Sequence, residues 1–148
     1  MAPFVVLITL FALLSILDHL QIPVAFGWWT SLRLALAGMF LLTASAHWGK
    51  RRSDLIRMVP AFFPRPDLLV TVTGVLEVLG AVGLMQRKVA PYAALGLALV
   101  LLAVFPANIR GAREGLTIAG RPVPTLLPRA LLQIVFLAAT ITVFVAGS

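Results

Sequence analysis

The chain has 148 residues, of which 61% are hydrophobic and 11% are charged, and its formal net charge is +7. Because about a quarter of the residues of an average soluble domain are charged, this composition excludes an ordinary water-soluble globular domain. The sequence contains no cysteine, which excludes structural disulfides, thiol redox chemistry and thiolate-bound metal or iron–sulfur sites in this chain.

Long stretches with few or no charged residues alternate with short basic ones along the chain. A membrane-spanning helix needs about 20 mostly apolar residues, so these stretches predict one all-α, polytopic membrane domain over residues 1–148. The five predicted spans are 2–17, 31–49, 68–86, 89–109 and 129–147. The first is short, but it lacks a basic leader and a convincing cleavage site, so we expect a retained helix, not a signal peptide.

The basic residues predict how the spans are oriented. Nine of the 12 lysines and arginines fall in or beside the two loops after the second and fourth spans, and three fall on the other side. The positive-inside rule then makes the loops 50–67 and 110–128 cytoplasmic, with the N-terminus inside and the C-terminus outside. We expect the inner membrane of a bacterial cell. The basic residues flank apolar runs and form no aromatic-interleaved stripe, so nucleic acid is not an expected partner.

The first cytoplasmic loop contains the run "RMVPAFFPRP", in which Pro60, Phe62 and Phe63 stand among two further prolines. One interpretation is an interfacial loop whose phenylalanines dip toward lipid. The other is a lid over a site that opens on this face of the membrane. The sequence favours the first.

The third span, "TVTGVLEVLGAVGLM", is apolar except for Glu77. A carboxylate at that depth is expensive in lipid, and such residues are usually functional. The positions that share its helix face carry small side chains (Thr73, Gly74, Gly80 and Ala81). Small residues let membrane helices approach closely, so we expect Glu77 to face the bundle interior and to meet a polar group from another span.

Three other spans each place one polar side chain in the cytoplasmic half. His47 ends the second span, Asn108 follows Pro106 at the end of the fourth, and Gln133 begins the fifth. Pro106 leaves one helix carbonyl without its donor. Together these residues predict a ligand-binding pocket lined by His47, Glu77 and Asn108, with Gln133 at its rim.

We expect the polar and aromatic residues in the external half of the membrane to stabilise the structure and not to bind a ligand. Asp18 and Arg33 could pair between the first two spans, and Trp28 and Trp29 are typical of an interfacial belt.

Metal binding is not expected. The two histidines, His19 and His47, fall on opposite sides of the membrane in this topology, so one protomer cannot supply two axial haem ligands. A three-ligand zinc site also lacks histidines.

The sequence resembles the DoxX-like family of small bacterial membrane proteins. The resemblance rests on "RLALAGMFLLTASAHW", "MVPAFFPRPDLLVTVTGVLEVLGAVGLM" and "FPANIRGA", which cover residues 33–113 in family order. It implies a four-helix core with the first span as an addition, and a link to membrane oxidoreductase systems. The residues that match recurrent polar or proline positions of that family are Arg33, His47, Pro60, Glu77, Pro106 and Asn108. Its disulfide-assisting branches need cysteine, which makes that role doubtful here.

Three functions remain open at this stage. The first is a subunit of a quinone-linked or redox-stress membrane complex, in which Glu77 and His47 bind a quinone-like or lipid-like ligand. The second is a small proton-coupled exporter of lipophilic cations. The third is a non-catalytic assembly or scaffold protein. No intrinsic cofactor is expected beyond a possible bound quinone or lipid, and the expected partners are the lipid bilayer, redox-complex subunits or further copies of this chain.

Overall fold

The computed structural model describes residues 2–22 and 27–147 of the chain. This part contains six helices and one short antiparallel ribbon. In chain order the elements are α1 (Ala2–His19), α2 (Trp28–Ser45), α3 (Arg52–Met58), α4 (Pro66–Met85), α5 (Ala90–Arg113), β1 (Thr117–Ile118), β2 (Arg121–Pro122) and α6 (Leu126–Gly147). The predicted all-α helical bundle is therefore confirmed.

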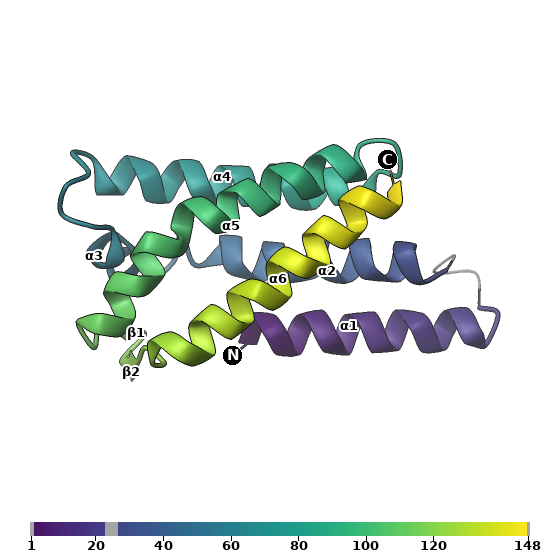
Figure 1. Ribbon diagram of the computed structural model, residues 1–148, viewed down its shortest axis with the longest axis horizontal. Helices are drawn as coiled ribbons and strands as arrows, with labels where there is room; N and C mark the ends of the chain where they lie inside the picture. The colour runs from purple at the N-terminus through teal and green to yellow at the C-terminus, as the bar shows by residue number, and fades with distance from the viewer. Residues whose placement is uncertain (1, 23–26, 148) are drawn as a thin grey trace.

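The five long helices run alternately up and down, and each corresponds to one predicted span (Figure 1). The ends differ most at two helices: α2 ends at Ser45 instead of residue 49, and α5 continues through Pro106 to Arg113 instead of residue 109. The sequence analysis also missed α3 and the ribbon, which lie in the two loops for which it predicted no secondary structure. The short ribbon has only two residues per strand, too few to produce a recognisable alternation of polar and apolar side chains.

Four helices in the described part of the chain are long and apolar enough to cross a membrane, namely α1, α4, α5 and α6. They make the chain a multi-pass membrane protein. The second predicted span, α2, is not one of the four, although with 18 residues it is as long as α1. It contains Arg33 and several hydroxyl side chains, and eight of its residues are buried, so α2 faces its neighbouring helices more than lipid.

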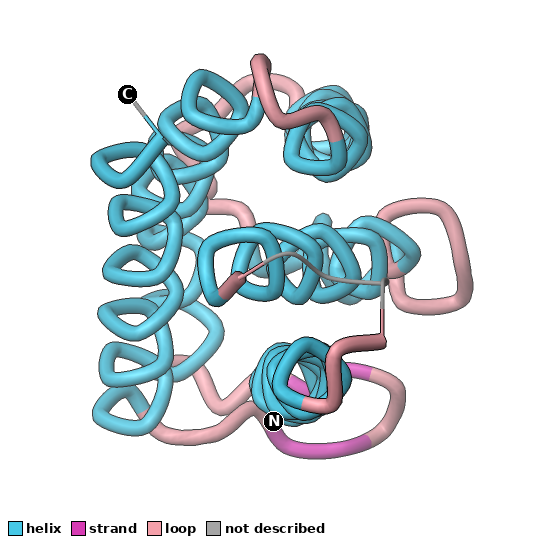
Figure 2. Tube along the Cα trace, turned by 90° about the vertical axis from the view of Figure 1, so that its right-hand side faces the viewer, coloured by secondary structure: helices cyan, strands magenta, loops and turns pink. Residues whose placement is uncertain are grey.

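The core of the bundle surrounds α2, which lies between α1 and α4 (Figures 1 and 2). Helices α5 and α6 pack against each other and close one side of this layer. Large buried side chains from four helices meet there: Phe40, Leu36, Met39, Leu84, Leu97 and Val143. By contrast α1 packs chiefly on α2, as expected for a helix added to a four-helix core.

One end of the bundle carries α3, β1 and β2, and the opposite end carries the turn between α4 and α5 and the C-terminus (Figure 1). We call the first the basic end, because nine of the 12 lysines and arginines lie in the segments there. They are Lys50, Arg51, Arg52, Arg57, Arg65, Arg110, Arg113, Arg121 and Arg129.

Asp54 on α3 ties the ribbon to the rest of the basic end. Its Oδ2 accepts a hydrogen bond of 2.9 Å from the backbone N–H of Ala119, and its Oδ1 accepts one from Arg57. Ala119 and Gly120 both have positive φ (52° and 74°), as the central residues of a type I′ turn do. An alanine with positive φ is strained by roughly 1–2 kcal/mol, and the contact with Asp54 offsets part of that strain.

The same contacts predict how the ribbon responds to acid. The N–H of Ala119, and then the Arg57 guanidinium, hold the pKa of Asp54 below its ordinary value. A carboxyl with a lowered pKa stabilises the folded arrangement above its ordinary pKa of about 3.9, and that stabilisation is lost as the pH falls through the lowered value. A spin label at Thr117→Cys should therefore be immobile at neutral pH and become mobile only below about pH 4.

The matched control for this experiment is Asp54→Ala, in which the label should be mobile at every pH. A label that stays immobile at neutral pH in Asp54→Ala would show that Asp54 does not hold the ribbon.

Candidate functional site

Glu77 lies on the face of α4 that packs against α2, and only 7% of its surface is exposed. The small side chains around it make this close approach possible. At Gly74 an added Cβ would come within 2.6 Å of the Cβ of His47, and at Gly80 within 2.5 Å of the side chain of Leu97 on α5. The prediction that Glu77 faces the bundle interior is confirmed.

Two polar side chains from the end of α2 reach the carboxylate. Thr43 Oγ1 donates a hydrogen bond of 2.7 Å to Glu77 Oε2, and His47 Nε2 lies 3.7 Å from Glu77 Oε1. His47 is itself buried, with 8% of its surface exposed. The expected polar neighbour from another span is thus present, and the sequence analysis paired the correct histidine with the carboxylate.

The protonation of this pair follows from the other nitrogen of His47. Nδ1 lies 2.6 Å from the carbonyl oxygen of Val70, which can only accept a hydrogen bond, so Nδ1 carries a proton. In a neutral imidazole Nε2 would then present a lone pair to the carboxylate of Glu77, and the two would repel each other. A proton on His47 Nε2 would face Glu77 Oε1 across 3.7 Å, at a closely packed position between the two helices.

The backbone around His47 is held by Arg52, the first residue of α3. Its Nη1 donates to the carbonyl of His47 at 2.9 Å, and its Nη2 contacts the carbonyl of Asp67 and Thr71 Oγ1 at 3.1 and 2.9 Å. Asp67 and Thr71 belong to the first turns of α4. A single guanidinium therefore fixes the segment that contains His47 against the start of α4.

The other two predicted site residues make their contacts elsewhere. Asn108 accepts a hydrogen bond from Arg129, and Gln133 donates one to the carbonyl of Leu101, so both connect α5 with α6. Gln133 is buried and lies close to the turn that Pro106 interrupts. The structure thus brings His47 and Glu77 together and places Asn108 and Gln133 in a separate group of contacts. A cavity of about 430 Å³ near Pro60 and Pro106 is lined by none of these four.

The predicted pairing of Asp18 with Arg33 is wrong. Asp18 accepts a hydrogen bond of 3.0 Å from the backbone N–H of Gly27. Arg33 donates instead to the carbonyls of Leu84 and Met85 at the end of α4, at 2.7 and 2.8 Å. The last carbonyls of a helix have no partner within it, so the C-terminus of α4 competes successfully for this arginine.

Trp29 completes the arrangement at that end. Its ring lies 5.2 Å from the Arg33 guanidinium, and its indole N–H donates to the carbonyl of Val143 on α6. Trp29 therefore packs inside the bundle, whereas Trp28, with 56% of its surface exposed, remains a candidate for the interfacial belt.

Thr43, Thr73 and Arg52 were not predicted as site residues. Thr43 lies four residues before His47, and Thr73 four before Glu77, so helical spacing was the available signal. Thr73 Oγ1 donates to the Leu69 carbonyl and lies 3.5 Å from His47 Nδ1. Arg52 had no such signal, because its helix was not predicted.

No group of three or more potential metal ligands occurs within residues 2–22 and 27–147. His19 ends α1 at the opposite end of the bundle from His47, which follows α2. The two histidines therefore lie on opposite sides, as the sequence indicated.

A family model described as "Domain of unknown function (DUF8561)" matches residues 36–144, which include both members of the His47–Glu77 pair. No curated protein and no solved structure matches the chain.

The packing of Gly74 against the His47 ring gives a direct test of how closed the site is. In Gly74→Ala the new methyl group would lie 2.6 and 2.7 Å from Cβ and Cγ of His47, so the two helices must separate. Overpacking of this kind costs about 1–3 kcal/mol, and we expect a corresponding loss of stability in detergent unfolding.

Gly96→Ala is the matched control, because no atom lies within 4 Å of the Cβ position there. It should be neutral or slightly stabilising, since alanine favours a helix over glycine. Equal destabilisation by the two substitutions would contradict the close contact at Gly74.

Proposed function

Because the chain belongs to the DUF8561 family of unknown function, we propose its function from the geometry of its own site. It is a multi-pass membrane subunit of a quinone-linked redox complex. Its His47–Glu77 pair takes up and releases a proton at the headgroup of a quinone-like ligand.

The observation that carries the proposal is the approach of His47 Nε2 to Glu77 Oε1, which are 3.7 Å apart and buried. His47 Nδ1 is committed to the Val70 carbonyl, so the proton between Nε2 and Glu77 is the one that can be exchanged. Thr43 supports the carboxylate through Oε2 and leaves Oε1 to face the imidazole. A carboxylate and an imidazole that share a proton form a donor and an acceptor within one site.

A quinone headgroup suits this donor. Its carbonyl oxygens accept hydrogen bonds, which either an imidazolium or a protonated Glu77 can supply. The side chains of His47 and Glu77 are 10% and 9% exposed, so a ligand would reach only the edge of the pair. The chain has no cysteine, so it has no thiol to carry electrons. The electrons must come from a partner protein or from the quinone itself, and the pair contributes a proton.

Two further features support the setting. The resemblance to the DoxX-like family implies an association with membrane oxidoreductases, and it covers the segments that contain His47 and Glu77. The basic end contains nine of the 12 lysines and arginines, which supports a bacterial inner-membrane protein with that end in the cytoplasm.

A second candidate function, that of a scaffold protein, is favoured because all polar atoms of the Glu77 and His47 side chains already have partners. Both carboxylate oxygens of Glu77 and both ring nitrogens of His47 have partners within the protein. Such a pair can act as a purely structural link between α2 and α4 in a scaffold protein. The two functions predict different results for the same substitutions.

We expect Glu77→Gln to keep the fold, because the amide retains the shape and can still contact Thr43 and His47. It cannot exchange the proton, so binding of a short-chain benzoquinone to the purified protein should no longer change the pH reported by a dissolved indicator dye. Glu77→Leu keeps the volume and removes polar recognition, so benzoquinone binding should be lost.

Thermal melting in detergent distinguishes the structural role of Glu77 from its proposed role in ligand binding. There Glu77→Leu should lower stability by about 1 kcal/mol, the contribution of an interhelical hydrogen bond in a membrane, and Glu77→Gln should be harmless. Unchanged benzoquinone binding in Glu77→Leu would remove the site hypothesis.

The orientation is tested by labelling single cysteines, since the chain has none of its own. Ser53 and Thr117 are exposed at the basic end, and Lys88 is exposed at the opposite end. A membrane-impermeant maleimide added to intact cells should label Lys88→Cys and leave Ser53→Cys and Thr117→Cys unlabelled until the cells are opened. The reverse pattern would place the basic end outside.

A further inference from the structure

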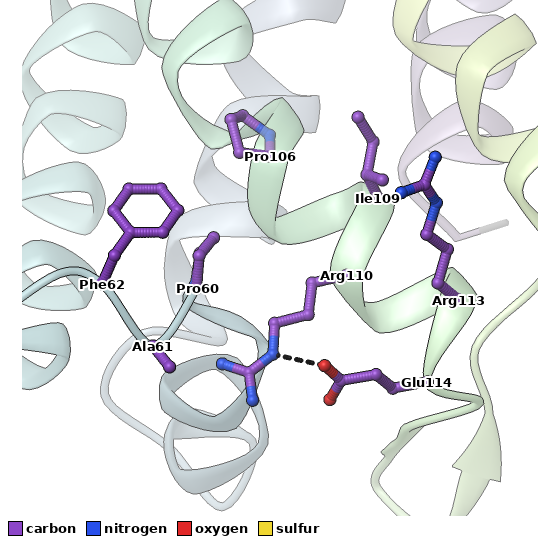
Figure 3. A pocket seen from close by; sticks show the side chains of 8 residues that line it. All are labelled: Pro60, Ala61, Phe62, Pro106, Ile109, Arg110, Arg113 and Glu114. Carbon is purple, nitrogen blue, oxygen red and sulfur yellow. Dashed lines mark hydrogen bonds and ion pairs between the residues drawn. The ribbon is translucent and has the colours of Figure 1, made fainter.

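A second candidate site lies at the basic end, away from the His47–Glu77 pair. It is the cavity of about 430 Å³ between the loop that follows α3 and the last turns of α5 (Figure 3). The loop contributes Pro60 and Phe62, and α5 contributes Pro106 and its C-terminal arginines. Neither His47 nor Glu77 lines it, so the reasoning that follows does not depend on the proposed function.

One side of this cavity is apolar and continues toward lipid. Phe62 is 75% exposed, although its ring stacks on Phe63 with 4.5 Å between the ring centres. Pro106 faces the cavity from α5, and Leu102, one helical turn before it, is exposed on the bundle surface. A hydrocarbon chain that extends from the cavity along α5 would therefore cover apolar surface along its length.

The other side of the cavity is cationic. Arg110 and Arg113 line it together with one carboxylate, Glu114. Arg110 Nε donates to Glu114 at 2.9 Å, so that carboxylate is already paired (Figure 3). Arg113 is exposed, and the ion pairs within residues 2–22 and 27–147 do not include it. One positive charge is left over at the cavity.

The walls of the cavity are held in place before any ligand arrives. Arg110 donates to the carbonyl of Val59, which fixes the loop to α5. Met58, at the end of α3, is buried against Gly111, where an added Cβ would come within 2.8 Å of its side chain. The backbone N–H of Phe63 also bonds the carbonyl of Pro60 at 3.1 Å. Because the loop is already fixed, binding of a ligand costs little conformational entropy there.

We propose that this cavity binds an amphiphile with an anionic headgroup. The headgroup, a phosphate or a carboxylate, contacts Arg113 and the remaining N–H groups of Arg110, and its hydrocarbon chain lies against Phe62 and Pro106. Guanidinium groups bind both anions through paired, charge-assisted hydrogen bonds. The position also fits, because the cavity lies where the apolar part of α5 gives way to its basic end, the depth of a lipid headgroup.

The test compares lipids on the full-length protein in detergent by native mass spectrometry. Phosphatidylglycerol should be retained in preference to phosphatidylcholine with the same acyl chains. Arg113→Gln should weaken that retention about tenfold, the effect of losing one hydrogen bond between charged groups. Arg121→Gln removes an exposed arginine of the same end that does not line the cavity, and it should change nothing.

A second pair of variants tests the apolar side. Phe62→Ala should weaken retention of phosphatidylglycerol, whereas Phe63→Ala, beside it in the loop but outside the lining, should have a smaller effect. Inorganic phosphate alone should not displace the lipid, because the hydrocarbon chain contributes to binding.

Three results would overturn the proposal. They are equal retention of the two lipids, equal losses in Arg113→Gln and Arg121→Gln, and full displacement by inorganic phosphate. The first would show that charge is not recognised, the second that only the overall charge of the surface matters, and the third that the site takes a soluble anion.

Discussion

A carboxylate inside an apolar bundle needs partners from the protein itself, because a bilayer offers no water to solvate it. Glu77 is that carboxylate, and much of the architecture of α2 and α4 follows from it. The small residues on its helix face bring α2 close enough for Thr43 and His47 to reach it. The imidazole in turn needs a partner for Nδ1, which the carbonyl of Val70, about two turns before Glu77 on α4, supplies. The spacing of α2 and α4 and the contacts of the pair therefore depend on the same side chains.

The same constraint explains the polar contacts at other levels of the bundle. The end of α4 leaves carbonyls without donors, and Arg33 supplies them from α2. The helix α5 continues through Pro106, which has no N–H to donate, and Gln133 of α6 donates to the nearby Leu101 carbonyl. Each of these side chains connects two helices. Polar groups that would be costly in lipid therefore specify which helices are neighbours, while apolar packing supplies the bulk of the contact.

The two proposed sites use opposite kinds of chemistry. The His47–Glu77 pair is buried between α2 and α4, and its polar atoms contact protein groups. The cavity beside Phe62 and Arg113 is open, with an unbalanced positive charge, and suits a ligand that is itself amphiphilic. Arg52, the first residue of α3, connects the two regions, since it donates to the backbone of His47 and to the first turns of α4. The loop that follows α3 then forms one wall of the cavity.

The sequence by itself determined the helical class, the positions of the five long helices and the inward direction of Glu77. Those features depend on local composition and on helical spacing, which any single sequence displays. It also identified His47 as the partner of Glu77, because counting residues from the cytoplasmic end of each span gives the depth of each side chain in the membrane. Only the tertiary structure decided that Asn108 and Gln133 contact Arg129 and Leu101 instead of joining that pair, and that Arg33 contacts the end of α4 instead of Asp18. The physical reason is that depth places a residue along the membrane normal but leaves the rotation of its helix undetermined. Rotation is set by the packing of all the helices at once, and it decides which of several polar groups at equal depth meet.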